Sequence, residues 1–197
     1  MIGQPGQASS REDSSVPRVF AALKIASAIA QELIEIARPL ERFAVHPIAN
    51  EDMHLTLVRP WAEPAVPAAI DKLKRAADEH CGFRLEFRHV RYGPDPKRPR
   101  LLWVECAAGD ELASLRSTLM SVFGQYDERS FLPHVTLARI RANAARIARK
   151  CPIDQSIDLA QDVTTVELMQ SPPPGERGYK VLASLQLRHQ TVKSPTC

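Results

Sequence analysis

Hydrophobic residues along this chain recur at two periods, which together predict a fold that mixes strands and helices. The period of two is clearest over residues 83–88, where Phe83, Leu85 and Phe87 alternate with charged residues. Such alternation is typical of a strand with one buried face and one solvated face. Further strands are predicted at residues 18–23, 101–106, 156–159, 163–170 and 179–187.

Apolar residues spaced three or four apart predict helices between these strands. In the first helix Ile29, Leu33 and Ile36 share one face, and Pro39 ends it because proline cannot continue a helix. The predicted helices cover residues 27–39, 65–80, 110–124 and 141–150.

One hexapeptide occurs twice and is the main functional signal in the chain. His54-Leu55-Thr56-Leu57-Val58-Arg59 recurs 80 residues later as His134-Val135-Thr136-Leu137-Ala138-Arg139. Side chains at i and i+2 of a strand share a face, so each copy points a histidine and a threonine the same way. The apolar residues between them face the core. Two such strands brought together would line a cleft with two histidines and two threonines.

Chance does not account for this repeat. Random placement of six histidines and seven threonines in 197 residues gives about 0.2 His-x-Thr triplets, whereas the chain has three. We interpret the third, at His189, as the chance member because it lies in a polar tail and lacks the leucine and arginine that follow in the other two. The alternative interpretation of the matched pair is two edge-strand histidines bonded to backbone groups.

The order of the predicted elements, with one motif strand in each half, indicates an α+β fold of two lobes related by approximate duplication. Residues 17–188 are expected to form this single bilobal domain. Residues 1–16 are polar and are interpreted as a disordered leader, and residues 189–197 as a loose tail.

The reactive side chains of the two motifs suit phosphodiester hydrolysis. The chain has no Walker loop, Gly-rich dinucleotide fingerprint or His-Glu-x-x-His zinc helix. Histidine titrates near pH 6.5, so one imidazole can accept a proton from water while its partner donates one to a leaving oxygen. Thr56, Thr136 and Arg139 can bind the nonbridging phosphate oxygens. This chemistry requires no metal and no cofactor.

The two motifs resemble the signature motifs of the two-histidine phosphoesterases, and most closely those of the RNA 2′,3′-cyclic phosphodiesterases, formerly called 2′-5′ RNA ligases. The likeness extends over residues 18–187 and includes Phe131-Leu132-Pro133 at the entry to the second motif. It implies two lobes whose antiparallel sheets form a central cleft carrying one motif each. The first motif departs from the family, because it continues Arg59-Pro60-Trp61 where an aromatic, leucine, glycine turn is usual.

The resemblance also assigns roles that the near-identical motifs leave open. It implies that His54 is the proton donor and His134 the proton acceptor, and that a 2′,3′-cyclic phosphate on an RNA terminus or a nucleotide is opened to a 2′-phosphate. Phe131 and Tyr179 are candidates to stack on a base, because aromatic faces hold bases without strict sequence preference. Either could equally be a core aromatic.

The two arginines that end the motifs are expected to differ. Position +5 from a histidine has the opposite parity, so a regular strand would turn both Arg59 and Arg139 away from the cleft. A bulge or the strand end could return a guanidinium to it. The resemblance favours this for Arg139, whereas Pro60 forces a turn directly after Arg59.

Composition and charge agree with this interpretation without adding to it. A net charge of +3 permits an anionic partner but is far below that of a protein that coats nucleic acid. The basic loop at residues 97–100 is either a flank of the cleft or a solvated charge cluster. Scattered cysteines and no membrane-length apolar stretch predict a cytoplasmic monomer without membrane partners.

Two other functions remain open on the sequence alone. The first is a non-catalytic nucleotide- or RNA-binding module with the same cleft. The second is a two-histidine metal site, but neither motif is accompanied by Asp, Glu or Cys at ligand spacing.

Overall fold

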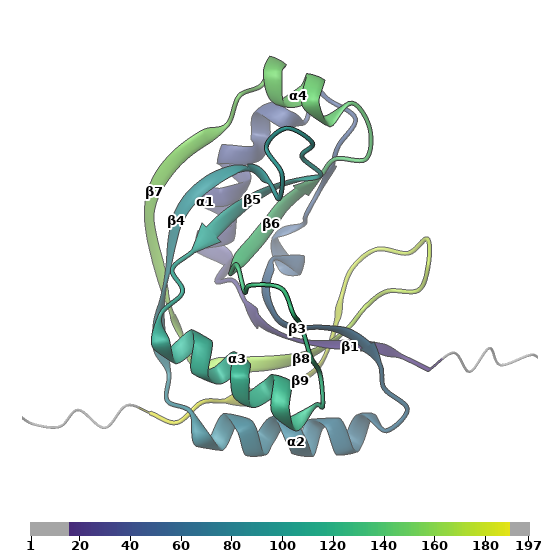
Figure 1. Ribbon diagram of the computed structural model, residues 1–197, viewed down its shortest axis with the longest axis vertical. Helices are drawn as coiled ribbons and strands as arrows, with labels where there is room; N and C mark the ends of the chain where they lie inside the picture. The colour runs from purple at the N-terminus through teal and green to yellow at the C-terminus, as the bar shows by residue number, and fades with distance from the viewer. Residues whose placement is uncertain (1–15, 190–197) are drawn as a thin grey trace, which may run out of the picture.

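A computed structural model describes residues 16–189 of the protein (Figure 1). The predicted disordered leader and loose tail therefore lie outside the described residues, apart from Val16 and His189. Within this range the chain forms one antiparallel sheet of nine strands. The strands are β1 (Arg18–Lys24), β2 (His46–Pro47), β3 (His54–Ala62), β4 (Phe83–Gly93), β5 (Leu101–Cys106), β6 (His134–Arg139), β7 (Asp154–Val163), β8 (Thr165–Gln170) and β9 (Lys180–Gln186).

The sheet consists of two halves, which confirms the predicted α+β fold with two lobes. Strands β7, β4, β5 and β6 follow one another in the first half, with β2 pairing with β6, and β3, β1, β8 and β9 form the second. The halves join where β3 pairs with β6, at Leu55 opposite Val135. In Figure 1 they form the two arms of an open C.

The junction of the halves carries an approximate two-fold relation. Leu55 and Val135 each follow the histidine of their motif, and they pair with one another. On the outer side, Lys24 of β1 pairs with His54, just as Glu105 of β5 pairs with His134. Equivalent strands thus flank the two motifs in the same register, as an internal duplication predicts.

Helices pack on both halves of the sheet. The helices are α1 (Ser27–Ala37), α2 (Val66–Glu79), α3 (Asp110–Val122) and α4 (Ala144–Lys150), with short 3₁₀ turns η1 (Arg38–Leu40) and η2 (Asn50–Asp52). Helices α2 and α3 pack on one another and on β3, β8 and β9, whereas α1 packs on β6 and β7 (Figure 1). None of the helices within residues 16–189 is long and apolar enough to cross a membrane.

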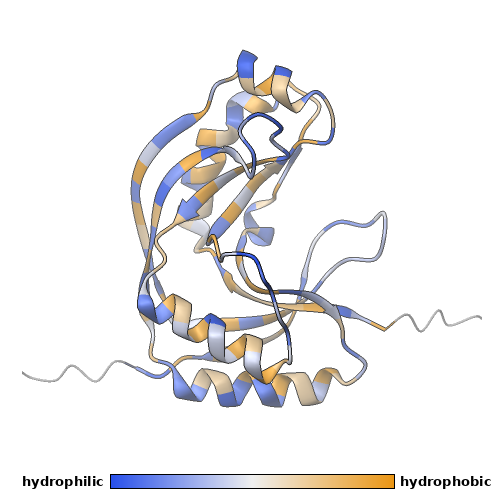
Figure 2. Cartoon of the chain, in the orientation of Figure 1, coloured by the Kyte–Doolittle hydropathy of each residue, from blue (hydrophilic) through white to orange (hydrophobic). Residues whose placement is uncertain are grey.

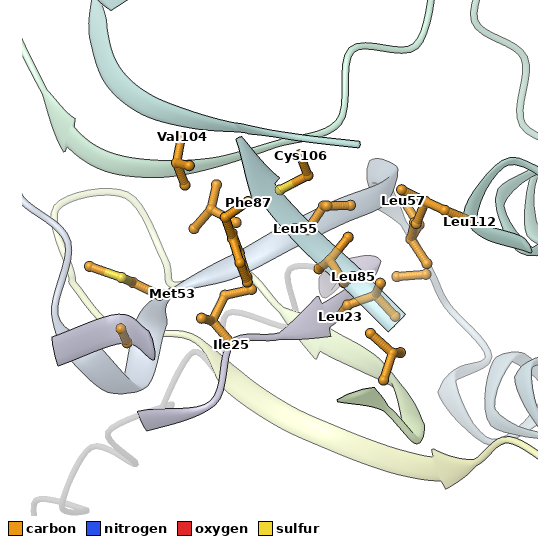
Figure 3. Packing of buried hydrophobic residues seen from close by; sticks show 14 of the residues in the cluster. Leu23, Ile25, Met53, Leu55, Leu57, Leu85, Phe87, Val104, Cys106 and Leu112 are labelled. Carbon is orange, nitrogen blue, oxygen red and sulfur yellow. The ribbon is translucent and has the colours of Figure 1, made fainter. Parts of the chain in front are cut away.

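The motif strands are anchored by the apolar residues that alternate with the histidines and threonines. Leu55, Leu57, Val135 and Leu137 are each at most 2% exposed. Figure 3 shows Leu55 and Leu57 among the buried side chains of β1, β4 and β5. Figure 2 shows the corresponding alternation of polar and apolar positions along the strands. Burial of this face fixes which side chains the opposite face presents.

Strand β4 is longer than its alternating pattern predicted. It continues to Gly93, five residues beyond the predicted end, and pairs with β7 over residues 83–91. The register shifts between Phe87 and His89, so that Val90 and Tyr92 are the next buried residues. An extra residue reverses the parity of a strand, and a strict period of two therefore ended the predicted strand too early. Strand β7 is longer than predicted because it follows β4 along this length.

The buried hydroxyl of Tyr92 allows a test of this packing. Tyr92 is 7% exposed and donates a hydrogen bond of 2.6 Å to the backbone oxygen of Cys151, and burial raises the pKa of the phenol. We expect the Tyr92→Phe variant to lose about 1–3 kcal/mol of unfolding free energy in urea, because the carbonyl loses its donor. Tyr126→Phe is the matched control, since Tyr126 is 82% exposed. Equal effects of the two substitutions would contradict the assignment.

Candidate active site

The two motif histidines line one cavity at the junction of the sheet halves. His54 begins β3 and His134 begins β6, and the antiparallel pairing of these strands brings the two residues to the same place. The cavity measures about 160 Å³ and is lined by Ile48, Asp52, His54, Thr56, Leu101, His134, Thr136, Arg139 and Tyr179. Six of the seven predicted site residues thus gather at one place, and Phe131 is the exception.

Both imidazoles are held by the same hydrogen bond. His54 Nδ1 lies 2.6 Å from the backbone oxygen of Asp52, and His134 Nδ1 lies 2.8 Å from that of Leu132. A carbonyl oxygen only accepts, so each Nδ1 carries the proton of this bond. Each Nε2 is then left for chemistry in the cavity, as acceptor in a neutral ring or donor in a charged one. The two imidazoles are thus held in equivalent ways, and the approximate two-fold relation of the strands includes their Nδ1 bonds.

An aromatic ring supports each histidine from the neighbouring strand. The Phe20 ring of β1 lies 5.0 Å from that of His54, and the Trp103 ring of β5 lies 4.4 Å from that of His134. Neither Phe20 nor Trp103 was predicted as a site residue, because the pairing of β1 with β3 and of β5 with β6 is not visible in the sequence. Gly93 leaves room for Trp103, because a Cβ at this position would lie 2.4 Å from the indole ring.

Arg139 reaches the cavity through a bulge in β6. Trp103 pairs with Thr136 and Leu102 with Ala138, so Leu137 is an extra residue between these pairs. Leu137 and Ala138 are both buried, and the parity of the strand is reversed beyond them. Arg139 therefore lies at the cavity with His134 and Thr136. A bulge was one of the two irregularities expected to bring its guanidinium there.

Asp52 ties the segment after β8 to the His54 side of the cavity. Its carboxylate accepts a hydrogen bond of 2.9 Å from the backbone N–H of Tyr179. The Tyr179 ring lies edge-on to His54 at 4.8 Å, and its hydroxyl accepts a bond of 3.4 Å from Arg139 Nη2. Asp52 thus positions an aromatic side chain beside one histidine. Asp52 is not predictable from the sequence, because its partner Tyr179 lies 127 positions away.

The pKa of the His54 imidazole is lowered from its ordinary value. Burial lowers the pKa of its imidazole, and the charges of Arg139 and His134 lower it further. The bond to the Asp52 carbonyl and the Asp52 carboxylate act in the opposite direction. In the free protein the net effect favours the neutral imidazole at pH 7.

Several other predicted or repeated residues lie elsewhere. The Phe131 ring lies 4.5 Å below the guanidinium of Arg116 and does not line the cavity. Arg59 Nε lies 3.3 Å from a carboxylate oxygen of Asp127, beside a different cavity. His189 is exposed and lies near Arg84. The basic loop at residues 97–100 lines a further, separate cavity.

The donors at the site do not form a metal-binding cluster. Over residues 16–189, no group of three or more His, Cys, Asp or Glu side chains is arranged to hold a metal ion. The cavity is lined by two imidazoles, three hydroxyls, a guanidinium and the carboxylate of Asp52. These groups can transfer protons and bind an anion.

Paired His-x-Thr strands at the junction of two sheet halves define the class of two-histidine phosphoesterases. A sequence model of the 2′-5′ RNA ligase superfamily matches residues 25–172 of the chain. The chain belongs to this superfamily, as its two motifs predicted.

Two curated relatives carry the same kind of name. An RNA 2′,3′-cyclic phosphodiesterase of Aeropyrum pernix is 36% identical over 100 residues, which are 48% of this chain and 56% of the relative. Another of Aquifex aeolicus is 26% identical over 103 residues, 48% of this chain and 55% of the relative. The chain spans about half the length of the curated relatives it matches.

Solved structures match the fold over most of the chain. A protein of Thermus thermophilus has a TM-score of 0.73 at 25% identity, with 88% of this chain and 99% of that chain covered. Escherichia coli LigT complexed with 3′-AMP has a TM-score of 0.68 at 23% identity, with 87% and 98% covered. These matches confirm the bilobal architecture.

The lowered pKa of His54 predicts how stability depends on pH. The unfolded chain takes up a proton on this residue at its ordinary pKa of about 6.5, whereas the folded chain takes it up only at lower pH. This contribution to stability is complete above the unfolded pKa and is lost as the pH falls through the folded pKa. We therefore expect His54→Gln to lose less unfolding free energy than the wild type between about pH 7 and about pH 5.

Urea unfolding at each pH measures this difference, with His189→Gln as the control because His189 is exposed. The control is expected to follow the wild type. If His54→Gln loses as much unfolding free energy as the wild type over this pH range, the lowered pKa of His54 is contradicted.

Proposed function

We propose that this protein hydrolyses the 2′,3′-cyclic phosphate of an RNA terminus or a nucleotide to a 2′-phosphate, by paired histidine acid–base catalysis without a metal ion. The observation that carries the proposal is the matched pair of imidazoles. Each has its Nδ1 bonded to the carbonyl two residues earlier, and both line one cavity with two threonines and Arg139. The relatives named RNA 2′,3′-cyclic phosphodiesterase support the same activity.

In the proposed reaction His134 Nε2 accepts a proton from water as the water oxygen attacks phosphorus. The bond from phosphorus to O3′ breaks, and O3′ takes the proton of His54 Nε2. The products are a 2′-phosphate and a 3′-hydroxyl, and one water is consumed. Proton exchange with solvent restores a charged His54 and a neutral His134. An in-line displacement needs base and acid on opposite sides of phosphorus, which suits two histidines on separate strands.

The remaining cavity residues serve the phosphate and the nucleoside. The hydroxyls of Thr56 and Thr136 donate to the nonbridging oxygens, where charge gathers in the transition state, and Arg139 adds a charge-assisted bond. Tyr179 lies beside His54 and takes the position of a stacking residue. Phe131 does not have this role, because Arg116 covers its ring.

The substrate itself helps to charge the proton donor. Burial lowers the pKa of His54 in the free protein, which opposes the role of acid. A bound phosphodiester carries a negative charge, and an opposite charge within about 4–6 Å favours the protonated imidazole. His54 is therefore assigned to take up its proton as the substrate binds. Both histidines come from one chain, so the proposed site needs no residue from a second subunit.

Turnover of a nucleoside 2′,3′-cyclic phosphate in excess EDTA tests the proposed function. We expect the wild type to form the 2′-phosphate, and the His54→Ala and His134→Ala variants to lose about 10²–10⁴-fold in turnover, because each removes one half of the acid–base pair. Chromatography that separates the 2′- and 3′-phosphates measures both rate and product.

His189→Ala is the matched control, because it removes the histidine of the third His-x-Thr triplet. It is expected to retain wild-type turnover. Loss of activity in EDTA that zinc restores would contradict the metal-free mechanism. Tight binding of the nucleotide without turnover would favour the non-catalytic binding module.

The two motif arginines give a second prediction on the same substrate. Arg139 lines the histidine cavity, whereas Arg59 pairs with Asp127. We expect Arg139→Ala to reduce kcat/KM by about ten- to a hundredfold, the scale of a lost charge-assisted contact. Arg59→Ala should cost much less. Steady-state kinetics measure the difference, and equal losses would mean that both arginines serve the phosphate.

A further inference from the structure

A second cavity, of about 300 Å³, lies farther along β3 than the histidine cavity and is rich in arginine. Its lining includes Arg18, Arg59, Arg116, Tyr126 and Asp127. Three of these side chains carry a positive charge and one a negative charge. The mechanism proposed above does not use them.

The single carboxylate of this cavity does not satisfy the guanidiniums around it. Oxygens of Asp127 lie 3.3 Å from Arg59 Nε, 3.2 Å from Arg129 Nε and 3.9 Å from Arg116 Nη2. A guanidinium has five N–H donors, whereas a carboxylate has about four acceptor sites. Most of the donors around Asp127 therefore have no carboxylate oxygen to bind. This excess of donors and of positive charge favours an anionic ligand.

Arg116 is the most buried arginine of this cluster, and its ion pair with Asp127 is long. Its side chain is 18% exposed, and its Nε is buried without a hydrogen-bond partner among the described residues. The Phe131 ring lies 4.5 Å from the guanidinium carbon and supports it through a cation–π contact. A largely buried charge costs free energy unless it is paired and hydrogen-bonded. An anion in the cavity would complete its environment.

The arginine-rich cavity borders motif strand β3 and the segment that follows α3. Strand β3 carries His54 and Thr56 to the histidine cavity and Arg59 to this one. The segment that contains Asp127 leads into His134, and Figure 1 shows it running across β3. Five residues of a strand span about 17 Å, so a ligand that contacts both cavities must be an extended chain of about this length. Tyr126 is 82% exposed at the mouth of the arginine-rich cavity and presents an aromatic surface to such a ligand.

We propose that this arginine-rich cavity binds a backbone phosphate of an RNA strand whose cyclic-phosphate end occupies the histidine cavity. Arginine suits this role because its planar donors bind phosphate oxygens in pairs. Tyr126 stacks on a neighbouring base, a contact that tolerates any base. The inference rests on the proposed function, and it makes an RNA terminus, rather than a free mononucleotide, the preferred substrate.

Kinetics on two substrates test this inference. One is a short oligoribonucleotide ending in a 2′,3′-cyclic phosphate, and the other is the corresponding nucleoside 2′,3′-cyclic phosphate. We expect Arg59→Ala to raise KM about tenfold on the oligoribonucleotide, because one charge-assisted phosphate contact is lost. Its effect on the mononucleotide should be much smaller. Tyr126→Ala is expected to show the same selectivity.

Arg38→Ala is the matched control. Arg38 is 61% exposed and pairs with Glu35, much as Arg59 is 58% exposed and pairs with Asp127, but Arg38 lines neither cavity. The control is expected to treat both substrates as the wild type does. Equal losses of Arg59→Ala on the two substrates, or no loss on either, would overturn the proposed phosphate site.

A binding measurement separates this inference from the proposed activity. Fluorescence anisotropy with a labelled oligoribonucleotide ending in a 2′-phosphate requires no turnover. Arg59→Ala should bind more weakly than Arg38→Ala. Its affinity should also depend less steeply on salt concentration, because a protein with one phosphate contact fewer releases fewer counterions on binding. If the wild type turns over neither substrate, the activity fails but this comparison still decides the phosphate site. Equal binding by the two variants would overturn it.

Discussion

The pairing of β3 with β6 is the interaction on which the site depends. Leu55 and Val135 face one another at the junction of the two sheet halves, and both are fully buried. This register places the histidine before each of them, and the threonine after each, on the opposite face. A slip of one residue would turn these side chains into the core and the leucines into the cavity. Burial of the apolar face therefore holds the chemistry in place.

The two-fold relation of the motifs gives equivalent reactive groups, and their surroundings make them unequal. Each imidazole bonds through Nδ1 to a carbonyl two residues earlier. His54 is enclosed by Phe20 and Tyr179, and its pKa is lowered chiefly by burial. His134 packs on Trp103 instead. The proposed mechanism needs the two histidines in different protonation states, and the side chains around the two rings differ accordingly.

The sequence predicted the parts of the site that local pattern controls. The repeat of His-x-Thr with intervening apolar residues was enough to place two histidines and two threonines on one face, because strand parity is a local property. The same reasoning recognised that Arg139 could reach the cleft only through an irregularity. The bulge at Leu137 provides it.

The remaining parts depend on which strands become neighbours. Trp103 supports His134 only because β5 pairs with β6, and Asp52 holds Tyr179 only because the segment after β8 returns to the cavity. Phe131 has an aromatic ring that could stack on a base, but Arg116 of α3 covers this ring. The bulge in β4 also interrupts the alternation of apolar and polar residues, so a strict period of two does not predict the second half of that strand. Such long-range contacts leave no periodic trace in a single sequence.

A crystal structure with a bound nucleoside 2′-phosphate tests most directly the claim that the two histidines act on one phosphorus atom. We expect phosphate oxygens within about 2.6–3.2 Å of both Nε2 atoms, the reach of proton transfer. The histidines should lie on opposite sides of phosphorus, with the threonine hydroxyls on its nonbridging oxygens. A phosphate that contacts only one histidine, or that binds outside the cavity between β3 and β6, would contradict it.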